Sequence, residues 1–179
     1  MKKKVFIVSS TPRKNGNSDI LADEFARGAR DAGHTVTKVN IRDLSLKFCI
    51  GCMSCHRSGK CVLNDEMNGL YEKVRSADTL VFATPVYYYA VCVQLKTFLD
   101  RLNPLYGRDN EFKEVYLLAT AADGAQSAMD GAVKDIQGWI DCFDGVKLKG
   151  VLRGVGLTDA GEAESSAYAA TAYETGRNI

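Results

Sequence analysis

Apolar residues along the chain follow two patterns, which are short continuous runs and stripes with helical spacing. Continuous runs are typical of strands buried on both faces, and stripes at intervals of three and four residues are typical of amphipathic helices. The predicted strands cover residues 4–9, 35–41, 79–84, 115–120 and, less regularly, 146–157. The predicted helices start near Ser18, at a cap on Asn64, near Val91 and near Met129, and a last helix covers 160–176.

Strand and helix alternate five times along the chain, which predicts a doubly wound α/β fold with a parallel sheet and helices on both faces. The sequence contains no internal repeat, no low-complexity tract and no linker. We therefore expect one domain over residues 1–179, with a cysteine-rich insertion at about 42–63. Sheets of this kind bind ligands at the carboxyl ends of their strands, so function is expected in the loops after the first, third and fourth strands.

The first of these loops, "SSTPRKNGNSD", combines hydroxyls, amides, a glycine and two cations directly before a predicted helix. The free N–H groups and the dipole of a helix N-terminus favour an anion, and a phosphate fits best. An ordinary capped turn is the alternative. The loop matches neither the dinucleotide-binding nor the P-loop glycine motif. The candidate anion-binding residues are Ser10, Thr11, Arg13, Asn15, Gly16, Asn17 and Ser18.

The second loop, "TPVYYYAVCVQ", holds three consecutive tyrosines, which cannot all face one core. At least one ring is therefore expected to be exposed, where it can lie against a flat ring system. Packing under neighbouring loops or in a subunit interface is the alternative. The third loop, "TAADGAQS", has small residues that allow close backbone approach. Together the loops indicate a ligand with a phosphate at one end and a planar heterocycle at the other.

Several of these strings carry a family resemblance. They are Thr11-Pro12-Arg13, Gly16-Asn17-Ser18, "TPVYYY" and "QLKTFLDR". On them the chain resembles the flavodoxin-like NAD(P)H-dependent FMN reductases, especially their iron–sulfur flavoprotein branch. The usual Gly before Ser-Pro-Arg is Ser10 here, and the usual Ser is Thr11.

The resemblance implies a flavodoxin-like five-stranded parallel sheet that binds FMN and takes electrons from NAD(P)H. The FMN phosphate would be held by Thr11, Arg13, Asn15, Asn17 and Ser18. The isoalloxazine would lie along Pro85, Val86, Tyr87 and Tyr88, and its pyrimidine edge along Thr120, Ala121, Ala122 and Gly124. Flavin chemistry requires no side-chain acid or base, so no catalytic side chain is nominated, and His34 and His56 are expected at the surface.

Cys49, Cys52, Cys55 and Cys61 lie close together with the spacing C-x₂-C-x₂-C-x₅-C. In a reducing compartment, clustered cysteines favour metal or redox chemistry over disulfides. The first three match the cluster-binding run of bacterial ferredoxins, so the four are a candidate [4Fe–4S] site. Zinc and free thiols remain open alternatives. The cations expected to offset the cluster charge are Lys47, Arg57 and Lys60, and the packing cysteines expected to be buried are Cys92 and Cys142.

A net charge of +1 indicates no nucleic-acid partner and no strongly charged docking surface. No apolar run approaches the roughly 20 residues that cross a bilayer, and the N-terminus lacks a secretory pattern. The sequence therefore predicts a cytoplasmic FMN-dependent oxidoreductase without a membrane partner. Exposed apolar loops further predict a homodimer or homotetramer. The alternatives are a non-enzymatic electron-transfer flavoprotein and a redox-sensing module.

Overall fold

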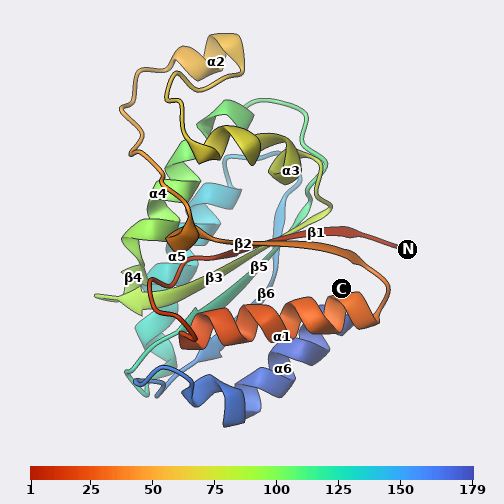
Figure 1. Cartoon of the computed structure of the whole chain (residues 1–179), viewed down its shortest axis with the longest axis vertical. Helices are drawn as coiled ribbons and strands as arrows, with labels where there is room; N and C mark the ends of the chain where they lie inside the picture. The colour runs from red at the N-terminus through yellow and green to blue at the C-terminus, as the bar shows by residue number, and fades with distance from the viewer.

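The computed structural model describes all residues from Met1 to Ile179 and has a five-stranded parallel sheet at its centre (Figure 1). Its strand order is β2-β1-β3-β5-β6, which is the flavodoxin-like order and confirms the predicted fold class. A two-residue strand, β4, pairs antiparallel with the end of β3. The strands are β1 (Lys4–Ser9), β2 (Thr35–Asn40), β3 (Thr79–Tyr87), β4 (Ala90–Val91), β5 (Glu114–Thr120) and β6 (Lys147–Gly154).

Helices cover both faces of this sheet, with α1 and α6 on one side and α3, α4 and α5 on the other (Figure 1). The α-helices are α1 (Asn17–Asp31), α2 (Ser54–Ser58), α3 (Tyr71–Arg75), α4 (Val93–Arg101), α5 (Asp130–Ile140) and α6 (Ala167–Arg177). Short 3₁₀ turns are η1 (Ile41–Asp43), η2 (Glu66–Gly69), η3 (Asn103–Leu105), η4 (Gln126–Met129) and η5 (Glu162–Ser165). No helix is both long and apolar enough to cross a membrane.

Two apolar cores lie on the two faces of the sheet, and β1 contributes to both. Phe6 and Val8 pack into the larger core with α4 and α5, while Val5 and Ile7 pack into the smaller one with α1 and α6. Successive side chains of a strand point to opposite faces, so a strand between two helical layers must be apolar throughout. This geometry explains why the strands read as continuous apolar runs.

Helices α1 and α6 touch backbone to backbone. A methyl group on Gly28 would lie 2.0 Å from the carbonyl oxygen of Tyr173, and one on Gly176 would lie 2.1 Å from that of Phe25. Real Cβ atoms cannot approach a backbone oxygen so closely, so the packing of these two helices requires glycine at both positions.

Two predicted helix starts were wrong. Asp65, not Asn64, provides the cap, because its carboxylate accepts a hydrogen bond from the Met67 backbone nitrogen at 3.1 Å. The segment after it splits into η2 and α3 instead of forming one helix. Near the C-terminus, η5 intervenes and α6 begins at Ala167 rather than at Ala160.

The cysteine-rich segment leaves the body of the protein after Lys47 and returns at Asp65, and these residues are tied together at its base. Asp65 accepts hydrogen bonds from the Lys47 backbone nitrogen at 2.8 Å and from both terminal nitrogens of Arg101 at 2.5 and 2.9 Å. Arg101 also donates to the Lys47 carbonyl at 2.7 Å. The side chains of Arg101 and Asp65 are 0% and 4% exposed. We call Lys47, Asp65 and Arg101 the base clasp.

Candidate functional site

A cavity of about 160 Å³ lies where the carboxyl ends of β1, β3 and β5 meet the start of α1. Its lining residues are Thr11, Arg13, Gly16, Asn17, Ser18, Pro85, Val86, Tyr87, Thr120, Ala121, Ala122, Leu157 and Thr158. Residues from all three predicted loops therefore meet at one place. Leu157 and Thr158 were missed, because residue 157 was taken as the end of a strand and 158 as a connection.

Four of the predicted residues lie outside this lining, namely Ser10, Asn15, Tyr88 and Gly124. The Ser10 side chain is fully buried, and its hydroxyl donates to the Ala83 carbonyl at 2.8 Å. The sulfur of Cys92 lies 3.2 Å from the same hydroxyl oxygen. Ser10 thus joins the ends of β1 and β3 and supports the cavity from behind.

The start of α1 offers free hydrogen-bond donors to the cavity. Gly16 at the N-cap has no side chain to cap the helix, and the backbone N–H groups of Asn17 and Ser18 have no acceptor within the chain. The Ser18 hydroxyl is buried without a hydrogen-bond partner. Unpaired buried donors are costly, and an anion at a helix N-terminus satisfies them. These residues therefore fit a phosphate group.

Gly16 is required by the shape of the loop. A methyl group there would lie 2.5 Å from the Thr11 hydroxyl oxygen, so any side chain would displace Thr11. The Thr11 oxygen in turn accepts a hydrogen bond from the Arg13 backbone nitrogen at 3.2 Å. The loop is thus folded back on itself around the helix start.

The segment after β6 closes the cavity from another side. Arg13 donates to the Thr158 carbonyl at 3.0 Å, and the Asn17 side chain donates to the Asp159 carbonyl at 2.8 Å. The Asn17 side-chain oxygen accepts from the Ala163 backbone nitrogen at 3.0 Å. The Asn17 side chain therefore holds the wall of the cavity, and it is the backbone of Asn17 that remains free for a ligand.

Asp19 places a buried carboxylate in the first turn of α1, close to the anion-binding residues. Although burial alone would raise its pKa, hydrogen bonds from Lys38 and Arg42 outweigh this effect and hold the pKa below the ordinary range. Its oxygens lie 2.6 Å from the Lys38 ammonium and 2.7 Å from the Arg42 guanidinium. The carboxylate is therefore charged and neutralised by two cations.

A strained hairpin turn carries the tyrosines. Tyr88 and Tyr89 connect β3 to β4, and both have positive φ, at 50° and 63°. Such turns normally use Asn-Gly, because side chains other than Asn and Gly disfavour this conformation. Tyr88 is 100% exposed, which confirms the prediction that at least one ring of the loop is free. The turn is anchored by Asp135, which accepts from the Val91 backbone nitrogen at 3.1 Å.

The four clustered cysteines line a second, narrow cavity together with the end of α4. Cys55 is buried, Cys61 is half-buried, and Cys49 and Cys52 are exposed. The cavity holds about 20 Å³, enough for one water, and no three of the thiols are arranged to hold a metal ion. Four soft sulfur donors facing one space nevertheless fit a thiolate-bound metal centre.

The charges around this second cavity differ from the prediction. Lys47, Arg57 and Lys60 are all exposed and none of them lines the cavity, whereas the buried guanidinium of Arg101 does. Asp100 lies at the edge and pairs with Lys96 at 2.6 Å. Burial raises the pKa of the Cys55 thiol, while hydrogen bonds from the backbone and side chain of Ser54 lower the pKa of Cys52.

Helix α4 separates the two candidate sites. It starts directly after the tyrosine hairpin and ends at Arg101 beside the cysteines. Its nine residues span roughly 14 Å. The two sites therefore lie at opposite ends of one helix.

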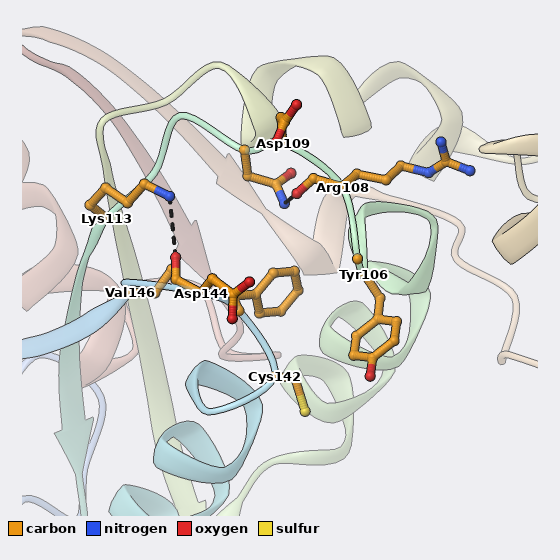
Figure 2. Close-up of a pocket in the computed structure, with 10 residues that line it drawn as sticks. Tyr106, Arg108, Asp109, Lys113, Cys142, Asp144 and Val146 are labelled. Atoms are coloured by element: carbon orange, nitrogen blue, oxygen red, sulfur yellow. Dashed lines mark hydrogen bonds between the residues drawn. The ribbon is translucent and has the colours of Figure 1, made fainter.

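A third cavity, of about 350 Å³, lies at the amino ends of β5 and β6, away from the first (Figure 2). Lys113 donates to the Asp144 carbonyl at 3.2 Å on its wall, and the Cys142 side chain lies near Tyr106. Cys142 is exposed, so its predicted burial was wrong, because it follows the end of α5 rather than lying on its inner face. Cys92 is buried as predicted.

Comparison with known proteins places these features in context. A family model described as NADPH-dependent FMN reductase matches residues 3–153. An iron-sulfur flavoprotein of Archaeoglobus fulgidus is 39% identical over 109 residues, which are 61% of this chain and 49% of that protein. An iron-sulfur flavoprotein of Methanocaldococcus jannaschii is 34% identical over 102 residues, which are 57% and 53% of the two chains. The chain thus spans about half the length of these curated relatives.

Among solved structures, an NAD(P)H:quinone oxidoreductase from Methanothermobacter marburgensis superposes with a TM-score of 0.77. The match covers 99% of this chain and 96% of the other at 19% sequence identity. At that identity the likeness supports the fold alone.

Proposed function

The chain belongs to the NADPH-dependent FMN reductase family, and from this premise we propose that the cavity at the start of α1 binds FMN. The observation that carries the proposal is the set of unpaired donors, namely the Asn17 and Ser18 backbone N–H groups and the buried Ser18 hydroxyl. A terminal phosphate would accept from all three. Arg13 on the same wall adds a positive charge.

The rest of the cavity suits the ring of a flavin. Pro85, Val86 and Tyr87 provide an apolar wall, and Thr120, Ala121 and Ala122 are small enough for their backbone to approach a ligand closely. The bound flavin supplies hydride and single-electron chemistry. The chain itself positions the phosphate, shields one ring face and needs no acid or base. His34 accepts from the Lys3 backbone nitrogen at 3.0 Å, and His56 lies in the cysteine segment, so neither lines the cavity.

We propose that the activity is transfer of electrons from NAD(P)H or a reduced carrier to an acceptor. The test is anaerobic oxidation of NADH and NADPH by the FMN-loaded protein with a quinone or an azo dye present. Turnover with either nicotinamide supports the proposal. Rapid electron exchange with a protein carrier but no nicotinamide turnover would instead favour an electron-transfer flavoprotein, and neither activity would favour a redox-sensing module.

Replacing Arg13 by Ala is expected to weaken FMN binding about tenfold, because it removes one charge-assisted hydrogen bond at a partly solvated position. Fluorescence titration of the apoprotein with FMN measures the change. Lys14→Ala is the matched control, because Lys14 is an exposed cation of the same loop outside the cavity lining. Equal losses in the two variants would mean that loop charge, rather than a contact at Arg13, attracts the phosphate.

We further propose that Cys49, Cys52, Cys55 and Cys61 bind one [4Fe–4S] cluster. All four line one cavity, their spacing suits a cluster, and relatives of this chain are named iron-sulfur flavoproteins. Because the cavity holds only about 20 Å³, the exposed half of the segment that carries Cys49 and Cys52 would move outward on loading. Zinc and free thiols are the competing outcomes.

We also propose a homo-oligomer, either a dimer or a tetramer. Large apolar side chains are exposed at both ends of α4, namely Phe48, Ile50, Met53, Val62, Tyr88, Tyr89 and Val93. Exposed apolar patches of this kind usually mark interfaces. Light scattering at micromolar concentration is expected to give at least twice the chain mass of 19.5 kDa. A mass of one chain would contradict the proposal.

A further inference from the structure

Asn103 connects the rigid body of the protein to one of the clustered thiols. It lies at the start of η3, and its side-chain nitrogen donates to the Cys55 sulfur at 3.5 Å. Its side-chain oxygen lies 3.1 Å from the His56 Nε2 atom, which fixes the direction of the amide. The His56 ring stacks on Tyr106, with centroids 5.4 Å apart. The donor is thus held in place before any metal arrives.

Tyr71 carries a second donor on the same side. Its hydroxyl is buried without a hydrogen-bond partner and lies close to both the Arg101 guanidinium and the Cys61 thiol. A guanidinium only donates, so Arg101 can satisfy the phenol oxygen but cannot accept its proton. A tyrosine hydroxyl keeps its proton at neutral pH, because its ordinary pKa is about 10. Of these two neighbours, only the sulfur of Cys61 can take a hydrogen bond from it.

A buried hydroxyl without a partner costs free energy, so its presence needs a reason. Arg101 lines the same cavity, and its Nε atom is also buried without a partner. The Tyr71 hydroxyl therefore lies beside Cys61, and Arg101 lies on the wall of the cavity that the four thiols share. Cys49 and Cys52 are exposed and lack such donors from the body of the protein.

We infer that Tyr71 and Asn103 are positioning residues that donate hydrogen bonds to the thiolates of Cys61 and Cys55 and thereby strengthen metal binding at the four-cysteine site. The inference rests on the proposed metal-binding role of that site. It divides the site into a fixed half, Cys55 and Cys61, and an exposed half, Cys49 and Cys52, whose position adjusts to the metal. Hydrogen bonds of this kind orient ligands and typically change metal affinity by about 10–100-fold.

The test uses Co²⁺ as the probe, bound anaerobically to the reduced full-length chain and followed by its thiolate absorption bands. Tyr71→Phe and Asn103→Ala are each expected to weaken Co²⁺ binding about tenfold. Tyr168→Phe is the matched control, because Tyr168 is a half-buried tyrosine in α6 that packs against the smaller core and lies outside the four-cysteine cavity. It is expected to leave Co²⁺ affinity unchanged.

A second readout separates this role from a structural one. Removal of a partnerless buried hydroxyl is expected to leave the metal-free protein as stable as before or more stable, so the unfolding midpoint of Tyr71→Phe should not fall. Unchanged Co²⁺ affinity in both variants, or a loss of metal-free stability that matches the loss of affinity, would overturn the inference.

The iron–sulfur proposal can fail separately. If reconstitution yields no cluster but the two variants still weaken Co²⁺ binding, the inference holds and the cluster proposal falls. If the wild-type chain binds Co²⁺ no better than Cys55→Ser, both fail.

Discussion

Replacing Arg101 by Met is expected to lower the free energy of unfolding by about 3–5 kcal/mol, as removal of one partner from a buried ion pair does. The substitution keeps an unbranched side chain but leaves the Asp65 carboxylate buried without its guanidinium. It also removes the hydrogen bond to the Lys47 carbonyl, so the base clasp of the cysteine-rich segment opens. Urea denaturation monitored by circular dichroism measures the loss.

Lys96→Met in the same helix is the matched control. Lys96 pairs with Asp100 on the surface, where both side chains are about half exposed, and such pairs contribute less than about 1 kcal/mol. If the two substitutions lower the free energy of unfolding equally, the base clasp contributes no more to stability than a surface ion pair. The free energy of unfolding at acidic pH gives a further check, because the hydrogen bond from Arg101 lowers the pKa of Asp65. The stability from this pair is present above the ordinary Asp range and is lost as the pH falls through the lowered pKa.

Cys55→Ser is expected to abolish most iron binding and to leave FMN binding unchanged. After anaerobic reconstitution, the wild-type chain should contain about four iron atoms and the variant less than about one. Cys55 is the buried member of the cluster of thiols, so a hydroxyl there removes a ligand from the fixed half of the site. The proposed FMN cavity lies at the other end of α4, so flavin content should not change.

Cys142→Ser is the control for this prediction, because Cys142 is an exposed thiol outside the four-cysteine cavity. The same Cys55→Ser change is expected to slow reduction of one-electron acceptors more than reduction of the flavin by NAD(P)H. Equal iron content in wild type and Cys55→Ser would mean that the cysteines do not hold a cluster. Retention of one zinc ion per wild-type chain would then identify a zinc site.

The strands, the parallel sheet and the meeting of the three loops could be predicted from the sequence, because they depend on local pattern and topology. Continuous apolar runs identify strands between two helical layers, and the alternation of strands and helices then fixes a parallel sheet. Because the carboxyl ends of parallel strands share one edge, the loops at Thr11, Pro85 and Thr120 had to approach one another. That argument needs no side-chain detail, and the structure brings these loops to one cavity.

What the sequence did not predict depends on contacts between distant residues. The carboxylate of Asp65 holds an arginine 36 positions away, and this pairing, not local propensity, places the cap one residue after Asn64. Leu157 and Thr158 join the cavity because Arg13 and Asn17 bind the backbone of the segment that follows β6. No spacing rule identifies such partners.

The tyrosine hairpin illustrates a local conflict. Its residues favour a continued strand, and turn statistics favour Asn-Gly where Tyr88 and Tyr89 stand. The structure nevertheless reverses the chain there. Gly131 allows this packing, since a methyl group on it would lie 2.1 Å from the Tyr89 carbonyl oxygen. The contact between α5 and this turn cannot be predicted from the sequence of either segment alone.

The attachment of the last helix to α1 makes the C-terminal segment part of the proposed ligand site. Asn17 binds the segment before α6, and Gly28 holds α6 in backbone contact with the same helix that presents the anion-binding N–H groups. Local unfolding of the final residues would therefore release one wall of the cavity. A bound cofactor opposes that opening, so amide hydrogens in α6, remote from the cofactor itself, should exchange more slowly in the loaded protein.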